Sequence, residues 1–170
     1  MDTMMVLPTE PRQDVVPQQV LIVRMCLEAA EEDKNMQAEL AANPGQVFAN
    51  AGFPIDSWAL PAFNDYCRKE AGLTNVLVHL GNNGALSALG GIGCTLCKIA
   101  AYTVAIAIVA VGAGALSLLT AGSGVVVALA AFAGVAATTA LAFIVTLATA
   151  ISGGIGVVAS YICEWTGACP

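Results

Sequence analysis

The spacing of apolar residues changes once along the chain. From Gln18 to Cys67, apolar positions recur every three or four residues, which is the repeat of amphipathic helices. From Ile99 to Cys163 the chain is largely apolar, and these 65 residues include no Asp, Glu, Lys, Arg, His, Asn, Gln or Pro. We therefore predict an all-α protein, in which a small helical module precedes a hydrophobic helical hairpin or a multi-helix, membrane-active core.

Turn and capping residues divide the first part into short helices. Residues 1–17 contain three prolines and no periodic apolar pattern, so they are predicted to be a flexible tail. Four helices are expected after it, starting at Gln18, after Asp33, at Asn43–Pro44 and at Asp56 or Ser57, with Gly52 and Gly72 ending the last two. Their apolar faces are narrow, so the module is expected to be marginally stable alone or to fold on a partner.

The second part contains two runs that are long enough to cross a bilayer. Ile99–Leu119 has 21 residues, about 31 Å as a helix, which matches a hydrocarbon core of about 30 Å. Val125–Ile151 has 27 residues and is expected to tilt, overhang or break near Thr138–Thr139. Val157–Cys163 is too short to span, so we predict two spanning helices and a short third helix at the interface. Hydroxyl side chains would line a polar stripe if several copies assembled in a membrane, but bonds to their own helix are the simpler expectation.

The charges follow the same division. Residues 1–91 carry eleven acidic and five basic side chains, whereas residues 92–170 carry Lys98 and Glu164, so the first part holds the whole net charge of −6. This acidic balance argues against nucleic-acid binding, which needs clustered Lys and Arg. The first residues have neither the basic region nor the apolar run of a secretory signal, so export would need another route.

Four of the six cysteines bracket the apolar part, namely Cys94, Cys97, Cys163 and Cys169. An even set of this kind suggests two disulfides formed in an oxidising compartment, and the sequence leaves all three pairings open. Four thiols could instead hold a zinc ion, but we favour disulfides and expect no metal and no cofactor. Cys26 and Cys67 lie in the polar part and are expected to be reduced core residues.

One stretch of the first part resembles a known family. "ELAANPGQVFANAGFPI" (39–55) follows an apolar helix and an acidic turn. The whole stretch, about residues 18–80, resembles the nitrile-hydratase-type leader peptides of ribosomally made, exported peptides. The arrangement that carries this resemblance is Leu40…Asn43-Pro44…Phe48…Gly52…Ile55. The alternative is an unrelated helical domain.

The resemblance implies a processing point at Gly90–Gly91. Such leaders commonly end in Gly-Gly and are cut by a cysteine peptidase fused to an ABC exporter, whose narrow tunnel admits a backbone without Cβ atoms. Here the pair stands where the charge disappears, and it ends a linker at 81–91 that joins the module at 18–80 to a core peptide at 92–170. A flexible linker without processing is the alternative.

The residues before the glycine pair depart from the usual leader pattern. Apolar side chains are expected four, seven and twelve places from the cut, counting Gly91 as the last leader residue. These places hold Ala88, Ala85 and Leu80, while Leu86 and Leu89 are out of register.

Together these features predict the precursor of an exported antibacterial peptide, a bacteriocin, and not an enzyme. The resemblance implies that the leader keeps the core inert in the cytoplasm until a peptidase-containing ABC exporter cuts after Gly91. The secreted core would then enter the lipid bilayer of a target cell and permeabilise it, although Lys98 offers little attraction to anionic lipid.

Two rival interpretations remain open. A two-span integral membrane protein with an acidic cytoplasmic domain, such as a holin-like or scaffold subunit, would be neither cleaved nor oxidised. An enzyme related to nitrile hydratase would need the metal-binding Cys-x-x-Cys-Ser-Cys claw. Here Cys94-Thr-Leu-Cys97 is followed by Lys98-Ile99, so the third thiolate and the serine are missing.

Overall fold

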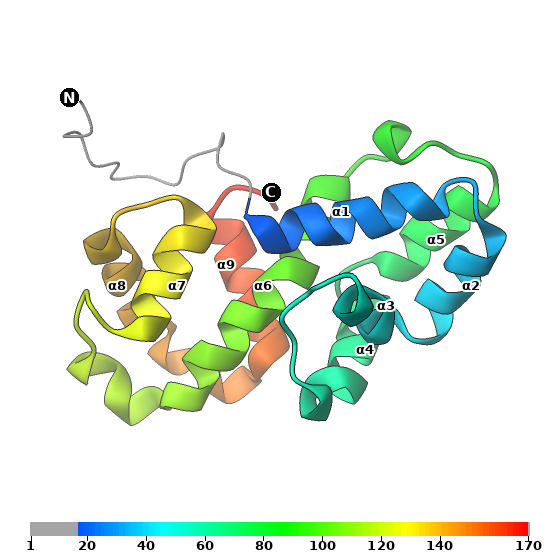
Figure 1. Ribbon diagram of the computed structural model, residues 1–170. Coiled ribbons are helices and arrows are strands. Elements are labelled where there is room, and N and C mark those ends of the chain that lie inside the picture. Colours follow the sequence, from blue (N-terminus) through cyan, green and yellow to red (C-terminus); the bar gives the residue numbers. More distant parts are fainter. Residues whose placement is uncertain (1–16, 170) are drawn as a thin grey trace. The chain divides into compact units, whose positions relative to one another are not determined.

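The computed structural model describes residues 17–169, which form helices and connecting turns without a strand (Figure 1). The all-α prediction is confirmed, with 76% of the described residues helical. Of the expected tail, residues 1–16 lie outside the described residues. The chain divides into two compact units, an N-terminal unit (Gln18–Thr103 with Cys169) and a C-terminal unit (Val104–Ala168). The division falls inside one helix, α6 (Ile92–Val111).

The N-terminal unit is built from short capped helices. Before α6 they are α1 (Gln18–Ala30), α2 (Lys34–Ala42), α3 (Pro44–Asn50), η2 (Ser57–Ala59), α4 (Leu60–Lys69), α5 (Leu73–Gly81) and η3 (Leu86–Ala88). The predicted caps are confirmed: the Asp33 carboxylate accepts hydrogen bonds from the N–H groups of Asn35 and Met36, and the Asn43 side chain accepts one from Gln46. The four expected helices are joined by a fifth, α5, which begins after Gly72.

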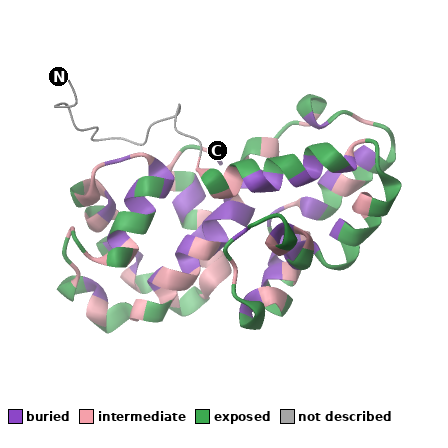
Figure 2. Cartoon of the chain, in the orientation of Figure 1, coloured by how far each residue is buried: buried purple, intermediate pink, exposed green. Residues whose placement is uncertain are grey.

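Each helix of this unit carries both buried and exposed positions (Figure 2), and aromatic rings form the centre of its core. The ring centroids of Phe48, Phe53 and Phe63 lie 5.5 to 6.3 Å apart, a spacing at which aromatic rings attract one another. α3 and α4 approach closely because Gly45 has no side chain. A Cβ there would lie 2.7 Å from the amide oxygen of Asn64, which accepts a hydrogen bond from the Gly45 N–H instead.

The C-terminal unit contains the rest of α6 and a series of short helices. These are η4 (Ala113–Leu118), α7 (Gly124–Ala133), α8 (Ala137–Thr146), η5 (Leu147–Thr149), η6 (Ile151–Gly153) and α9 (Ile155–Trp165). Leu129, Ile144 and Ile162 are fully buried. Trp165 stacks on Phe143 with the ring centroids 4.1 Å apart.

The predicted boundaries of the apolar helices are wrong in two places. The first helix begins at Ile92 rather than Ile99 and ends at Val111, because the chain turns at Gly112 with φ of +84°. The second run does not form one helix. It breaks at Gly134, whose φ is +71°, and the expected break at Thr138–Thr139 lies inside α8.

One helix in the described part of the chain is long and apolar enough to cross a membrane, namely α6, with a mean hydropathy of 2.1. A second span exists only if α7 and the segment Ala137–Thr149 are counted together, and these are bent by 105° relative to each other. The number of possible spans, judged by length and composition, is therefore one or two.

Candidate functional site at the glycine pair

The chain leaves α5 through a tight turn that fixes its direction towards the glycine pair. Asn83 has φ of +65°, and the Gly84 N–H donates to the carbonyl of His79. The His79 ring also bonds, through Nε2, to the carbonyl oxygen of Ala85 at 2.7 Å. A Cβ on Gly84 would collide with that ring and would have to displace it. His79, the single histidine of the sequence, is half-buried and holds this turn.

Leu86 anchors the linker to the N-terminal unit. Its N–H donates a hydrogen bond of 2.6 Å to the carboxylate of Glu31, which lies just beyond the end of α1. Its side chain is 6% exposed, whereas Ser87 and Ala88 beside it are exposed. A charged acceptor gives a stronger bond than a neutral one. The linker is therefore held at one point, four residues before Gly90.

Gly90 and Gly91 themselves stand clear of the rest of the protein. Both are exposed, and a Cβ on either would have no neighbour within 4 Å. Gly91 has φ of +79°, a conformation that side chains oppose, and its carbonyl accepts the N–H of Thr95 at the start of α6. The pair is therefore open to a peptidase, and Gly91 is also needed by the fold.

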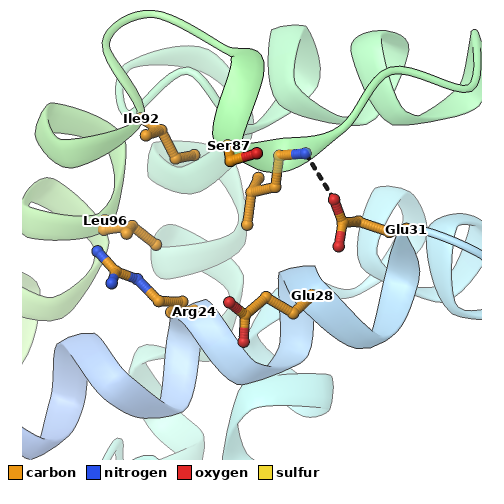
Figure 3. A pocket seen from close by; sticks show the side chains of 7 residues that line it. Arg24, Glu28, Glu31, Ser87, Ile92 and Leu96 are labelled. Atoms are coloured by element: carbon orange, nitrogen blue, oxygen red, sulfur yellow. Dashed lines mark hydrogen bonds between the residues drawn. The ribbon is translucent and has the colours of Figure 1, made fainter.

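A pocket of about 370 Å³ lies next to the pair (Figure 3). It is lined by Arg24 and Glu28 of α1, Glu31, Leu86 and Ser87 of η3, and Ile92 and Leu96 of α6. Figure 3 shows Arg24 and Glu28 projecting from α1, with Ser87 and Ile92 across the pocket from them. Two carboxylates and one guanidinium give the pocket a negative balance.

The four bracketing cysteines are all disulfide-bonded, in two pairs at disulfide distance. Cys94 pairs with Cys169, which lies 75 positions later in the sequence, and the two Cα atoms are 4.6 Å apart. Of the three pairings that the sequence left open, the structure has the one that joins Cys94 to Cys169. Both partners follow Gly91, so a cut after Gly91 leaves this bridge within one fragment.

Cys26 and Cys67 are buried and reduced in the N-terminal unit, as expected. Burial raises the pKa of both thiols above the ordinary value, so neither is an activated nucleophile. In the part of the chain that the structure describes, no three His, Cys, Asp or Glu side chains are arranged to hold a metal ion.

The three residues at the usual leader positions differ in burial. Leu80 is fully buried in α5, whereas Ala85 and Ala88 are exposed. Leu86, which is out of register, is the buried one near the cut. Glu31 and the pocket were not predicted, because a bond across 55 residues leaves no local pattern in the sequence.

Comparison with known protein families, with curated proteins and with solved structures found no match. The function must therefore be argued from the chain itself.

Proposed function

We propose that this chain is the precursor of an exported antibacterial peptide, with a leader at 18–91 and a hydrophobic core peptide at 92–170. The observation that carries the proposal is the coincidence of three features at Gly91. The residues up to Gly91 hold the whole net charge of −6, the glycine pair is exposed and unobstructed, and a 20-residue apolar helix begins at the next residue. The resemblance of residues 18–80 to nitrile-hydratase-type leaders points to the same division.

The proposed partner in processing is a cysteine peptidase fused to an ABC exporter. Such an enzyme must accept an extended segment in a narrow tunnel, and the two glycines add no Cβ atoms to that segment. The hydrogen bond between Glu31 and Leu86 holds the linker upstream of the cut. Leu89, Gly90 and Gly91 follow that anchor and form the segment that would enter the tunnel. The precursor would be cytoplasmic, and the mature peptide would be secreted and membrane-associated.

The proposed action of the mature peptide is to permeabilise a target bilayer without bond chemistry. α6 matches the thickness of a bilayer, and the C-terminal unit exposes large apolar side chains even when folded, namely Leu118, Val127, Val145 and Tyr161. The bridge between Cys94 and Cys169 suits a peptide that works outside the reducing cytosol. Nucleic acid is not an expected partner.

Mass spectrometry of the culture supernatant tests the proposal. We expect a species that starts at Ile92 and is four hydrogens lighter than the reduced peptide, because two disulfides have formed. Purified 92–170 should release dye from vesicles, and the uncut chain should release less. Intact chain confined to the membrane fraction of the producing cells would contradict the export step.

A two-span membrane protein with an acidic cytoplasmic domain is the second candidate. It is favoured by α6 and by the bent pair of α7 with Ala137–Thr149, which together could supply two spans. This candidate expects an uncut chain with reduced cysteines in the membrane. Thiol labelling of the membrane fraction separates the two proposals, because the second leaves all six cysteines reactive under denaturing conditions.

A further inference from the structure

The core of the N-terminal unit is completed by a residue that follows the proposed cut. Tyr102 of α6 places its ring 5.0 Å from the ring of Phe63 and 5.1 Å from that of Tyr66, between ring centroids. Tyr102 is 3% exposed and Phe63 is fully buried. Phe63 also contacts Phe48 and Phe53, so one aromatic cluster contains rings from both sides of Gly91.

Two further contacts join the start of α6 to the residues before the cut. Ile92 and Leu96 line the pocket together with Leu86 and α1. The helix also lies close to the turn between α4 and α5. The Lys98 ammonium donates to the carbonyl of Glu70 at 3.5 Å. A Cβ on Gly72 would lie 3.1 Å from the hydroxyl of Thr95. The contacts extend from the first turn of α6 to its third.

The bond between Gly91 and Ile92 lies outside the ring cluster, and its carbonyl contributes one backbone hydrogen bond, from the N–H of Thr95. Neither glycine has a neighbour within 4 Å of a built Cβ, whereas the rings lie in the buried core. Cutting that bond therefore removes a covalent link and leaves the ring contacts in place.

We propose, on the basis of the function proposed above, that residues 18–91 bind residues 92–103 tightly enough to keep the two fragments together after the cut. Cleavage and release are then separate steps. The leader acts as a helix-binding module whose ligand is the apolar, tyrosine-bearing first half of α6.

An apolar phase is the natural competitor for this helix. In water, the first half of α6 places Leu96 and Tyr102 against the leader, where both are buried. A bilayer offers the same side chains an environment without water. The leader would thus hold the peptide until it meets a membrane, and lipid would displace the leader.

A full-length chain with a protease recognition sequence inserted between Gly90 and Gly91 tests the inference without the exporter. After complete cutting in buffer, we expect both fragments to elute together in size-exclusion chromatography. Vesicles of phosphatidylcholine and phosphatidylglycerol should then bind 92–170 and leave the leader fragment free. Free leader fragment in buffer before any lipid is added, from a sample that circular dichroism shows to be helical, would overturn the inference.

Two tyrosines of the released fragment provide a matched pair of variants. Tyr102→Leu removes the ring contacts but keeps apolar volume, and we expect the leader to dissociate about tenfold more readily. Tyr161→Leu changes a tyrosine in α9 that is 47% exposed, and it should leave dissociation unchanged. Equal dissociation for the two variants would contradict the role of Tyr102. Phe63→Leu tests the same ring pair from the leader side if Tyr102→Leu fails to fold before cutting.

The binding of the two fragments in buffer is tested independently of export from cells. If the supernatant lacks the species starting at Ile92, the export proposal fails, although the cut fragments can still bind each other. If that species is exported but the fragments separate in buffer, the export proposal stands and the inference about the leader fails.

Discussion

Glu31 accepts a hydrogen bond of 2.6 Å from the backbone N–H of Leu86, and this contact joins residues 55 positions apart. It fixes the start of the segment that ends in the glycine pair. Because the bond lies at the edge of the pocket in Figure 3, its loss should free the linker while the core of the N-terminal unit stays folded.

We therefore expect Glu31→Ala to increase the rate at which a non-specific protease cuts near Gly90. Loss of a half-buried, charged hydrogen bond should also lower the free energy of unfolding by about 1 kcal/mol. Glu31→Gln keeps an acceptor oxygen and should have a smaller effect, and Glu32→Ala, at an exposed neighbour, serves as control. Equal cleavage rates for Glu31→Ala and Glu32→Ala would show that the bond does not restrain the linker.

Substitution of the two glycines should separate folding from processing. Gly91→Ala forces a side chain into a backbone with φ of +79°, so we expect a loss of about 1 kcal/mol in the free energy of unfolding. Gly90→Ala places a Cβ in open space and should leave stability unchanged. Both variants should block appearance of the Ile92 species in the supernatant. Urea denaturation and mass spectrometry measure the two effects, and normal processing of Gly90→Ala would rule out a peptidase that requires the pair.

Removal of the bridge between Cys94 and Cys169 should destabilise the chain strongly. A link that closes a loop across 75 residues removes about 4 kcal/mol of unfolded-state entropy on the chain-entropy model. We expect Cys94→Ser/Cys169→Ser to lose about 2–4 kcal/mol, measured by chemical denaturation under oxidising conditions. Under a reducing agent the wild type should lose stability, and the difference between it and the double variant should shrink. A difference that persists in reductant would point to packing of the thiols rather than to the bridge.

The buried thiol of Cys67 predicts a loss of stability at alkaline pH. Burial raises its pKa, so the folded chain keeps the thiol proton at pH values where the unfolded chain releases it. The stabilisation is fully present below the pKa of an unfolded thiol, about 8.5, and it is lost as the pH rises above that value. Urea midpoints from pH 7 to 9.5 should fall more steeply for the wild type than for Cys67→Ala. Cys26, whose pKa is also raised, contributes in the same direction in both proteins, so the comparison isolates Cys67.

The parts of the fold that the sequence predicts are those with local chemical causes. The carboxylate of Asp33 and the side chain of Asn43 cap helices within three residues of themselves, so a short window contains the whole cause. The Thr103 hydroxyl, expected to bond to its own helix, does so to the carbonyl of Ala100.

The apolar half contains no comparable local signal for where its helices begin and end. Almost every position from Ile99 to Cys163 is apolar, so no periodicity distinguishes a continuous helix from two short ones. The break at Gly134 depends on one residue with φ of +71°, and several other glycines in the same half offer the same freedom.

The contacts of Tyr102 are the other feature that the sequence does not predict. The change in charge divides the chain at Gly91, whereas the rings of Phe63 and Tyr66 belong with a residue beyond it. Contacts of this kind arise from the packing of the folded chain, so the composition of either part alone does not indicate them.

The bridge from Cys94 to Cys169 has a consequence for the route out of the cell. A polypeptide closed into a ring at both ends of its apolar part can enter a narrow channel only as two strands side by side. An exporter of the kind proposed above, if sized for one extended strand, would accept the thiol form and reject the oxidised form. Under the proposed export, the bond would therefore form after the crossing, and it would then prevent the peptide from returning.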